Sequence, residues 1–382
     1  MKKIAISVLA LTLAVLLATP AMAQKIEPYA SMRLGTFYSS HQSNVTGVDD
    51  NDDLNIDLAD ISRFGARGQV GDIYGVVEMG MRGNENRAGY DTTFGGAVPY
   101  YNRQIYTRLL YGKWDFGAGN LIVGQDYTLP TYPSAQQAPG VFDLQNGFIG
   151  VGTLWDRRYP QVKVVLDNGL TFLAAQTFDG IGPSGGFAPP AGTLAGGNSD
   201  VIIPKLQVAW DVRREGWYIG PGIGYNTYKY DDTAVGGTFD DDIDSYVAFL
   251  KGSWDPGPVA FRFTVHYGEN LSNFGILGRK NANAVVVNNS VQDAECWGGY
   301  LQAAFKVDPT TITVGWGYSS SDNDASGPEA DELMGIFVNC KVPIAETFFI
   351  VPEFSWWDGM DNAMGIEDPD SWHLGILWQA DF

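Results

Sequence analysis

Short runs in which apolar and polar residues strictly alternate recur along most of the chain. In the last run, 371–382, Trp372, Leu374 and Ile376 alternate with His373 and Gly375. The run 258–268 repeats the pattern, with Val, Phe and Tyr on one parity and Ala, Arg, Thr and His on the other. Because successive side chains of a β-strand point to opposite faces, these runs predict strands with one apolar and one polar face.

Counting such runs predicts sixteen strands, at about 26–38, 58–70, 73–83, 103–114, 117–126, 157–167, 169–178, 201–212, 216–229, 244–254, 258–269, 295–306, 310–320, 331–342, 345–356 and 371–382. The connections alternate between short turns such as Asp167-Asn168-Gly169 or Pro343-Ile344 and eight long loops, at about 39–57, 84–102, 127–156, 179–200, 230–243, 270–294, 321–330 and 357–370. An even number of antiparallel strands with short turns at one end and long loops at the other is typical of a transmembrane β-barrel.

The N-terminus carries the one long apolar run, Ile4 to Ala18, which follows Lys2 and Lys3 and precedes the small-residue sequence Ala21-Met22-Ala23. This order is typical of a cleaved secretory signal peptide, here predicted at 1–23. Residues 24–382 then form one barrel domain of an exported protein. No other segment approaches the roughly 20 apolar residues that a membrane-spanning helix needs.

Composition removes several classes of protein. With 44 Asp and Glu against 24 Lys and Arg, the net charge of −20 argues against nucleic-acid binding, which needs clustered cations. Two cysteines cannot make a disulfide scaffold, and we expect both to be free thiols because they lie near opposite ends of non-adjacent strands. The apolar faces end repeatedly in Trp, Tyr or Phe, which is typical of membrane-interface girdles and favours a membrane barrel over a soluble sandwich.

Three features of the chain resemble the outer membrane homotrimeric porin family. They are the C-terminal strand ending in Phe382, the regular succession of sixteen strands and the thirty-residue third loop at 127–156. The resemblance implies a homotrimer of water-filled channels in the bacterial outer membrane, in contact with outer-membrane lipid and lipopolysaccharide. It implies that the third loop folds into the barrel and narrows it, and that Phe382 is the assembly signal for the barrel-assembly machinery. The third loop lacks the Pro-Glu-Phe-Gly-Gly signature of enterobacterial porins, so no residue role is carried over there.

Basic residues on the polar parity are candidates for the channel lining. An arginine that faced lipid at the membrane midplane would cost about 2–4 kcal/mol. This free-energy cost favours the assignment of these arginines to the inner face of the barrel. The candidates for a basic constriction wall are Arg33, Arg63, Arg67, Arg82, Arg108, Arg157 and Lys163, whereas the adjacent Arg158 is expected near a rim. Carboxylates on the inserted loop, Asp126 and Asp143, would face this wall and set up a transverse field. The alternative is that these arginines only solvate the lumen and pair with neighbours.

The loop windows 49–57, 231–244, 322–332 and 358–370 hold 21 of the 44 acidic residues and no Lys or Arg, which predicts an anionic outer mouth. In one window, Asp322, Asp324, Glu329 and Asp331 partly match the spacing of a calcium-binding loop. Diffuse ion binding by solvated loops is the favoured alternative. Apart from this weak loop-bound Ca²⁺, no cofactor is expected.

No Walker-type loop or H-E-x-x-H motif occurs, and His266 and His373 both have lumen parity, so we expect no enzyme. The sequence favours an outer-membrane porin for passive diffusion of small hydrophilic solutes and ions. A substrate-specific outer-membrane channel is the first alternative. An exported, soluble all-β adhesin or lectin is the second.

Overall fold

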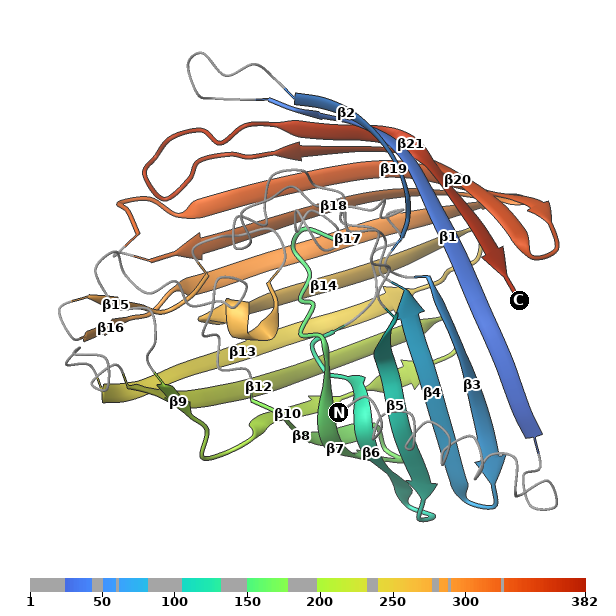
Figure 1. Ribbon diagram of the computed structural model, residues 1–382, viewed down its shortest axis with the longest axis horizontal. Helices are drawn as coiled ribbons and strands as arrows, with labels where there is room; N and C mark the ends of the chain where they lie inside the picture. Colours follow the sequence, from blue (N-terminus) through green and yellow to red (C-terminus); the bar gives the residue numbers. More distant parts are fainter. Residues whose placement is uncertain are drawn as a thin grey trace, which may run out of the picture.

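The alternating runs form a closed antiparallel β-barrel of sixteen strands, seen in the computed structural model (Figure 1). The structure describes residues 25–42, 51–59, 62–81, 105–131, 150–177, 198–231, 240–276, 282–287, 290–323 and 326–382. The predicted signal peptide lies outside these ranges. The first strand, β1 (Lys25–His41), closes the barrel by pairing with the last, β21 (Ser371–Asp381). Closure leaves no sheet edge, as a spanning sheet in hydrocarbon requires. The predicted all-β barrel is confirmed.

Most predicted strands are continuous: β4 (Ile73–Met81), β5 (Ile105–Asp115), β6 (Gly119–Tyr127), β7 (Arg158–Leu166), β8 (Leu170–Ala175), β12 (Trp217–Asp231), β13 (Asp240–Trp254), β14 (Val259–Glu269), β17 (Glu295–Val307), β18 (Thr310–Asp322), β19 (Asp331–Ala345) and β20 (Phe348–Asp358). The second strand is interrupted, because β2 (Asn51–Leu58) and β3 (Arg63–Val70) both pair with β1. The eighth is divided into β9 (Asn198–Asp200), β10 (Lys205–Trp210) and β11 (Val212–Arg214), which all pair with β12. Among the described residues, no helix is long and apolar enough to cross a membrane.

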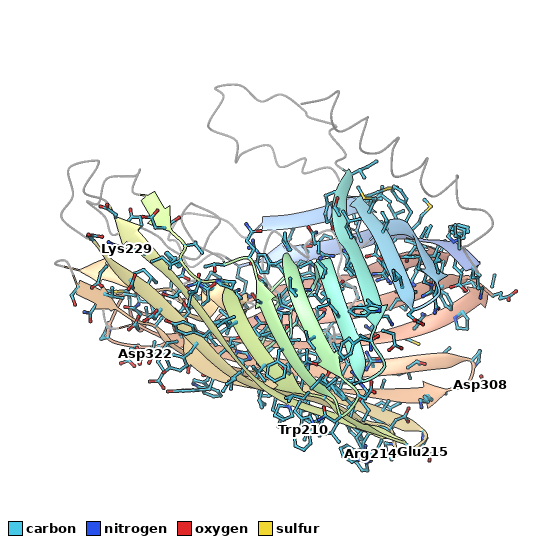
Figure 2. The ribbon with its side chains drawn as sticks, turned by 90° about the horizontal axis from the view of Figure 1, so that it is seen from below. Trp210, Arg214, Glu215, Lys229, Asp308 and Asp322 are labelled. Carbon is cyan, nitrogen blue, oxygen red and sulfur yellow. The ribbon has the colours of Figure 1, made fainter. Side chains whose placement is uncertain are left out.

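Turns and loops lie at opposite ends of the barrel, as predicted. Figure 2 shows Arg214, Glu215 and Asp308 at the turn end, and Lys229 and Asp322 at the loop end. Two predicted boundaries are wrong. The turn predicted at Pro343-Ile344 lies at 346–347, because β19 continues to Ala345 through an irregularity in register after Pro343. The first loop is shorter than 39–57, because β1 and β2 extend as a hydrogen-bonded hairpin beyond the alternating pattern.

Side-chain exposure separates the two faces of the wall. On β14, Val265 and Tyr267 are 47% and 46% exposed, whereas Thr264 and His266 are buried. Large apolar side chains are exposed in the same alternating manner on the other strands, which gives the barrel an apolar outer surface. The predicted parity is therefore confirmed for this strand. Cys296 and Cys340 are both free thiols, as predicted.

Candidate functional site

The described parts of the third loop, 128–131 and 150–157, lie against the inner wall of the barrel. The backbone N–H of Gly152 donates to Ser319 Oγ on β18 at 3.0 Å. Two strand positions away, a Cβ on Gly317 would lie only 1.7 Å from the carbonyl oxygen of Val151, so the wall needs glycine where the loop crosses it. The predicted inward course of the third loop is confirmed for these residues.

The sixth loop joins the third loop inside the barrel. Its short helix η3 (Leu271–Phe274) is drawn over β13 and β14 in Figure 1. The loops meet through a β-bridge between Leu154 and Ile276, and the Trp155 N–H donates to the Gly275 carbonyl at 2.7 Å. This contact between the third and sixth loops was not predicted from the sequence. The signal was available, because Leu271, Phe274 and Ile276 are three large apolar residues within six positions of the loop.

The two loops bury an apolar core within the barrel, which we call the inner plug. It unites both loops with inward residues of β8, β10, β13 and β17. Its members are Leu129, Leu154, Leu173, Ala175, Ala209, Val247, Phe249, Leu271, Phe274, Ile276, Ala282, Ala294 and Cys296. The two loops therefore cover an apolar core on these strands.

A buried ion pair fastens the third loop to the plug. Lys205 Nζ on β10 lies 2.6 Å from Asp156 Oδ1, and both side chains are 0% exposed. Gln207 Nε2 donates to Asp156 Oδ2 at 2.6 Å, and Lys205 also donates to the Asn273 carbonyl of the sixth loop at 2.6 Å. Such a pair tolerates burial because its charges are matched and hydrogen-bonded. Sequence reasoning missed Asp156 as a functional residue.

A second attachment holds the start of the third loop. Lys251 Nζ, on β13, donates to the Leu129 carbonyl at 2.8 Å, and the Leu129 N–H donates to Gln207 Oε1 at 2.9 Å. Since Gln207 bonds both Leu129 and Asp156, one side chain of β10 links the two described ends of the loop. The loop is fixed to the wall at both ends.

The opposite half of the interior, along β1 and β3–β7, is charged. Arg108 Nε on β5 lies 2.7 Å from Glu78 Oε1 on β4. Arg63 Nε on β3 lies 3.6 Å from Glu78 Oε2, and the Tyr29 hydroxyl donates to the same oxygen at 2.9 Å. Glu78 of β4 therefore links four neighbouring strands, β1, β3, β4 and β5. We call β1 and β3–β7 with these inward side chains the charged wall.

Further predicted basic residues pair with acids on the same wall. Arg67 Nε lies 2.8 Å from Glu27 Oε2, and Lys163 Nζ lies 2.5 Å from Asp126 Oδ2. Asp126 was predicted on the inserted loop, which is wrong: β6 runs through it to Tyr127, and it pairs sideways with β7. It therefore does not face the wall from across the channel. Arg33 Nε donates to Ser31 Oγ at 3.2 Å.

The placement of Arg157 and Arg158 also differs from the prediction. Strand β7 begins only at Arg158, and Arg157 precedes it with a φ of 58°, so strand parity does not set the direction of Arg157. The Arg158 guanidinium, expected near a rim, instead lies over the rings of Tyr127 and Trp155, at 5.4 and 5.6 Å from their centroids. This places Arg158 where the charged wall meets the third loop.

The remaining predicted residues are not brought into this site. Arg82, Asp143 and Asp324 lie outside the described residues. Within the described ranges, no group of three or more His, Cys, Asp or Glu side chains is close enough to hold a metal ion. At the C-terminus, the backbone of Phe382 exchanges hydrogen bonds with Ala30, and its side chain is 72% exposed.

Comparison with solved structures finds the same fold over nearly the whole chain. The outer membrane channel DcaP of Acinetobacter baumannii has a TM-score of 0.70 at 17% identity, covering 95% of this chain and 99% of its own. The anion-selective porin from Comamonas acidovorans gives 0.56 at 12% identity, with 94% and 99% covered. Salmonella typhi OmpF in complex with daunomycin gives 0.54 at 11%, with 93% and 97% covered. No protein-family model and no curated protein sequence matches the chain.

Proposed function

We propose that this protein is an outer-membrane porin whose water-filled channel passes small hydrophilic solutes and ions by passive diffusion. One observation carries the proposal: a closed sixteen-strand barrel has an apolar outer surface and a charged inner wall. A barrel of this size is wide enough for an aqueous channel. The shared fold of three outer-membrane channels and porins supports the same conclusion.

The water path in this proposal follows the charged wall. The inner plug lies beside β8, β10, β13 and β17, so we place the path of the solutes along β1 and β3–β7, where Arg63 and Arg67 are partly exposed. This path is lined by side chains that bind water and ions, such as Arg63, Arg67 and Glu27. Passage needs no chemical step, cofactor or ATP.

Conductance in a planar lipid bilayer tests the proposal. The purified protein is expected to insert in discrete steps whose size rises with salt concentration, and liposomes containing it should swell more slowly as the test sugar becomes larger. A current that one solute blocks saturably would favour the substrate-specific channel. Detergent-free solubility without any conductance would contradict the porin and favour the adhesin or lectin.

We also propose that the protein forms a homotrimer through contacts at the outer surface of β3–β5. Gly68, Gly75 and Gly112 lie directly beside one another in register on these three strands, and a Cβ on Gly112 would have no atom within 4 Å. The outer surface of the opposite strands instead carries large aromatics such as Trp297 and Trp316. Small residues let membrane-embedded backbones approach closely, so this glycine row suits contact with another copy.

Enlarging the glycine row tests the trimer. Gly75→Leu with Gly112→Leu is expected to convert the trimer to monomer in light scattering of the detergent-solubilised protein. The control is Ala248→Leu, which adds a leucine side chain to the exposed outer face of β13. A trimer that survives the double substitution would place the subunit contact elsewhere, while monomers that still conduct would leave the porin proposal intact.

A further inference from the structure

A shallow groove lies on the outer surface of the barrel, over β13, β14, β17 and β18. Its volume is about 940 Å³, near the upper end of the roughly 300–1,000 Å³ that is usual for small-molecule sites. The lining is almost entirely apolar, and its outward side chains include Leu250, Tyr267, Trp297, Trp316 and Tyr318. The groove therefore suits a hydrocarbon chain.

Gly299 forms the floor of this groove. In register, Gly299 lies between Val265 on β14 and Tyr318 on β18, and along β17 it lies between the outward side chains of Trp297 and Leu301. The rings of Trp297 and Tyr318 are in contact, with centroids 4.8 Å apart. A Cβ at position 299 would lie 3.3 Å from Val265 Cγ1, so any side chain there would begin to fill the gap.

A row of three carboxylates lies at the loop end of the groove. Glu269, Glu295 and Asp322 stand at the loop ends of β14, β17 and β18, directly opposite one another in register. All three have the parity of the exposed side chains of their strands, and Figure 2 shows Asp322 at the loop end. Like charges directly opposite in a sheet repel, so a positive charge beside the row stabilises it.

No basic residue of the same strands lies beside this row. Within β14, β17 and β18, all of whose residues the structure describes, the Lys and Arg residues are Arg262 and Lys306. Both lie nearer the turn ends of their strands, and Lys306 is paired with Asp255 at 2.8 Å. The row therefore favours a cation that comes from outside these strands.

Tyrosine side chains connect the carboxylates to the groove. The Tyr246 hydroxyl donates to Glu269 Oε1 at 2.6 Å, and Tyr267, whose ring lines the groove, hydrogen-bonds Glu295. Tyr267 is two residues from Glu269, and Trp297 is two residues from Glu295, which corresponds to about 7 Å along a strand. One amphipathic molecule can therefore reach the groove and the carboxylates together.

The position of the groove in the barrel favours a lipid as its occupant. The strands β13–β18 lie across the barrel from β3–β5, which carry the proposed subunit contact, so the groove faces the bilayer. The long loops of outer-membrane barrels are extracellular, which places the carboxylate row in the outer leaflet. Acyl chains supply hydrocarbon there, and lipid headgroups supply charge.

We propose that the groove binds an acyl chain of an outer-leaflet lipid whose headgroup carries a positively charged amine, held by Glu269, Glu295 and Asp322. An ammonium group donates charge-assisted hydrogen bonds to carboxylates, which matches the charge of the row. This inference goes beyond the proposed channel function, because it concerns the outer surface of the barrel and no solute.

Native mass spectrometry of the detergent-solubilised protein tests the headgroup. From an equimolar mixture of phosphatidylethanolamine and phosphatidylglycerol, we expect about tenfold greater retention of the amine lipid, since a charge-assisted hydrogen bond is worth at least a factor of about ten. Glu269→Gln with Glu295→Gln is expected to abolish this preference. The charge-matched control, Glu215→Gln with Asp308→Asn at the turn end, is expected to retain it.

Two results of this experiment would overturn the amine site. One is equal retention of both lipids by the native protein. The other is a preference for phosphatidylglycerol that needs Mg²⁺ and disappears with a chelator, because the carboxylates would then bind a lipid phosphate through a divalent cation.

Filling the groove tests the acyl-chain contact separately. Gly299→Leu is expected to reduce retention of both lipids about tenfold, and Ala248→Trp should act in the same way from β13 if Gly299→Leu fails to fold. Ala303→Leu, on the outer face of β17 but outside the groove, is the matched control. Unchanged retention in both groove variants would overturn the site.

The same variants separate this site from the other proposals. Conversion of the trimer to monomer by Gly299→Leu would overturn the lipid site, because the groove would then be a contact with a second copy of the chain. Conductance in planar bilayers is expected to be the same in Gly299→Leu and the native protein. Absence of any channel in the native protein would refute the porin proposal, whereas the lipid measurements would still decide the groove.

Discussion

Two regions of the barrel interior are built from the same alternating strands, yet one carries an apolar core covered by loops and the other a row of paired charges. Inward positions of β8, β10 and β13 carry Ala175, Ala209 and Val247, and two loops cover them. Inward positions of β3–β5 carry Arg63, Glu78 and Arg108. The comparison teaches that an inward side chain of a barrel does not necessarily face water, because loops folded inside the barrel cover part of the wall.

Two lysines show the difference at the level of single contacts. Lys205 and Lys163 both point inward and both lie within 2.6 Å of a carboxylate oxygen. The partner of Lys205 comes from the inserted loop, and both groups are fully buried. The partner of Lys163 comes from the adjacent strand, and the two side chains are 11% and 13% exposed. The first pair therefore fixes the loop, and the second joins two strands of the wall.

Removing one member of the buried pair should have the largest effect. Asp156→Ala leaves Lys205 charged and buried without its carboxylate, which is expected to destabilise the docked loop by about 3–5 kcal/mol. We expect larger and noisier single-channel currents, measured in planar bilayers. Asp126→Ala is the matched control, because its pair is partly exposed and lies between strands. Single-channel currents of unchanged size and noise in Asp156→Ala would show that the Asp156–Lys205 pair does not hold the loop.

Opening a cavity in the inner plug should have the next largest effect. Leu154→Ala removes a side chain that is 2% exposed and is expected to reduce the free energy of unfolding by about 2–5 kcal/mol. Urea titration of the folded protein in detergent, followed by tryptophan fluorescence, measures this. Leu374→Ala, 55% exposed on the outer face, is the control. If both substitutions reduce the free energy of unfolding equally, the plug is no more tightly packed than the outer surface.

Removing the partly exposed charges of the charged wall should have the smallest effect. It should change ion selectivity and leave the fold intact. Arg63→Ala with Arg67→Ala removes two positive charges whose side chains are 32% and 52% exposed. The anion-to-cation permeability ratio is expected to fall by about two- to threefold, because local potential sets ion concentration. Reversal potentials across a salt gradient measure the ratio. The charge-matched control is Arg213→Ala with Arg214→Ala, at the turn end of the barrel. A permeability ratio that changes only in this control would place the ion selectivity at the rim.

Much of the wall was predictable because its signals are local. The strand β14 and the C-terminal strand follow directly from alternation, and Asp167-Asn168-Gly169 marks a turn by its own chemistry. The errors have local causes as well. Pro343 looked like a turn but lies within β19, and Arg157 was given strand parity although β7 begins one residue later.

By itself the sequence determined the number of strands, the outward face of regular strands such as β14 and the ends at which turns and loops lie, because the two-residue period of a strand is visible in consecutive residues. Only the tertiary structure decided which part of the inner wall the described loop residues cover. Asp156 and Lys205 are separated by 49 positions, and Leu154 and Ile276 by more, so no local pattern connects them. Burial and hydrogen bonding across the barrel join these residues, and thereby place the inner plug against β8, β10, β13 and β17 but not against the charged wall.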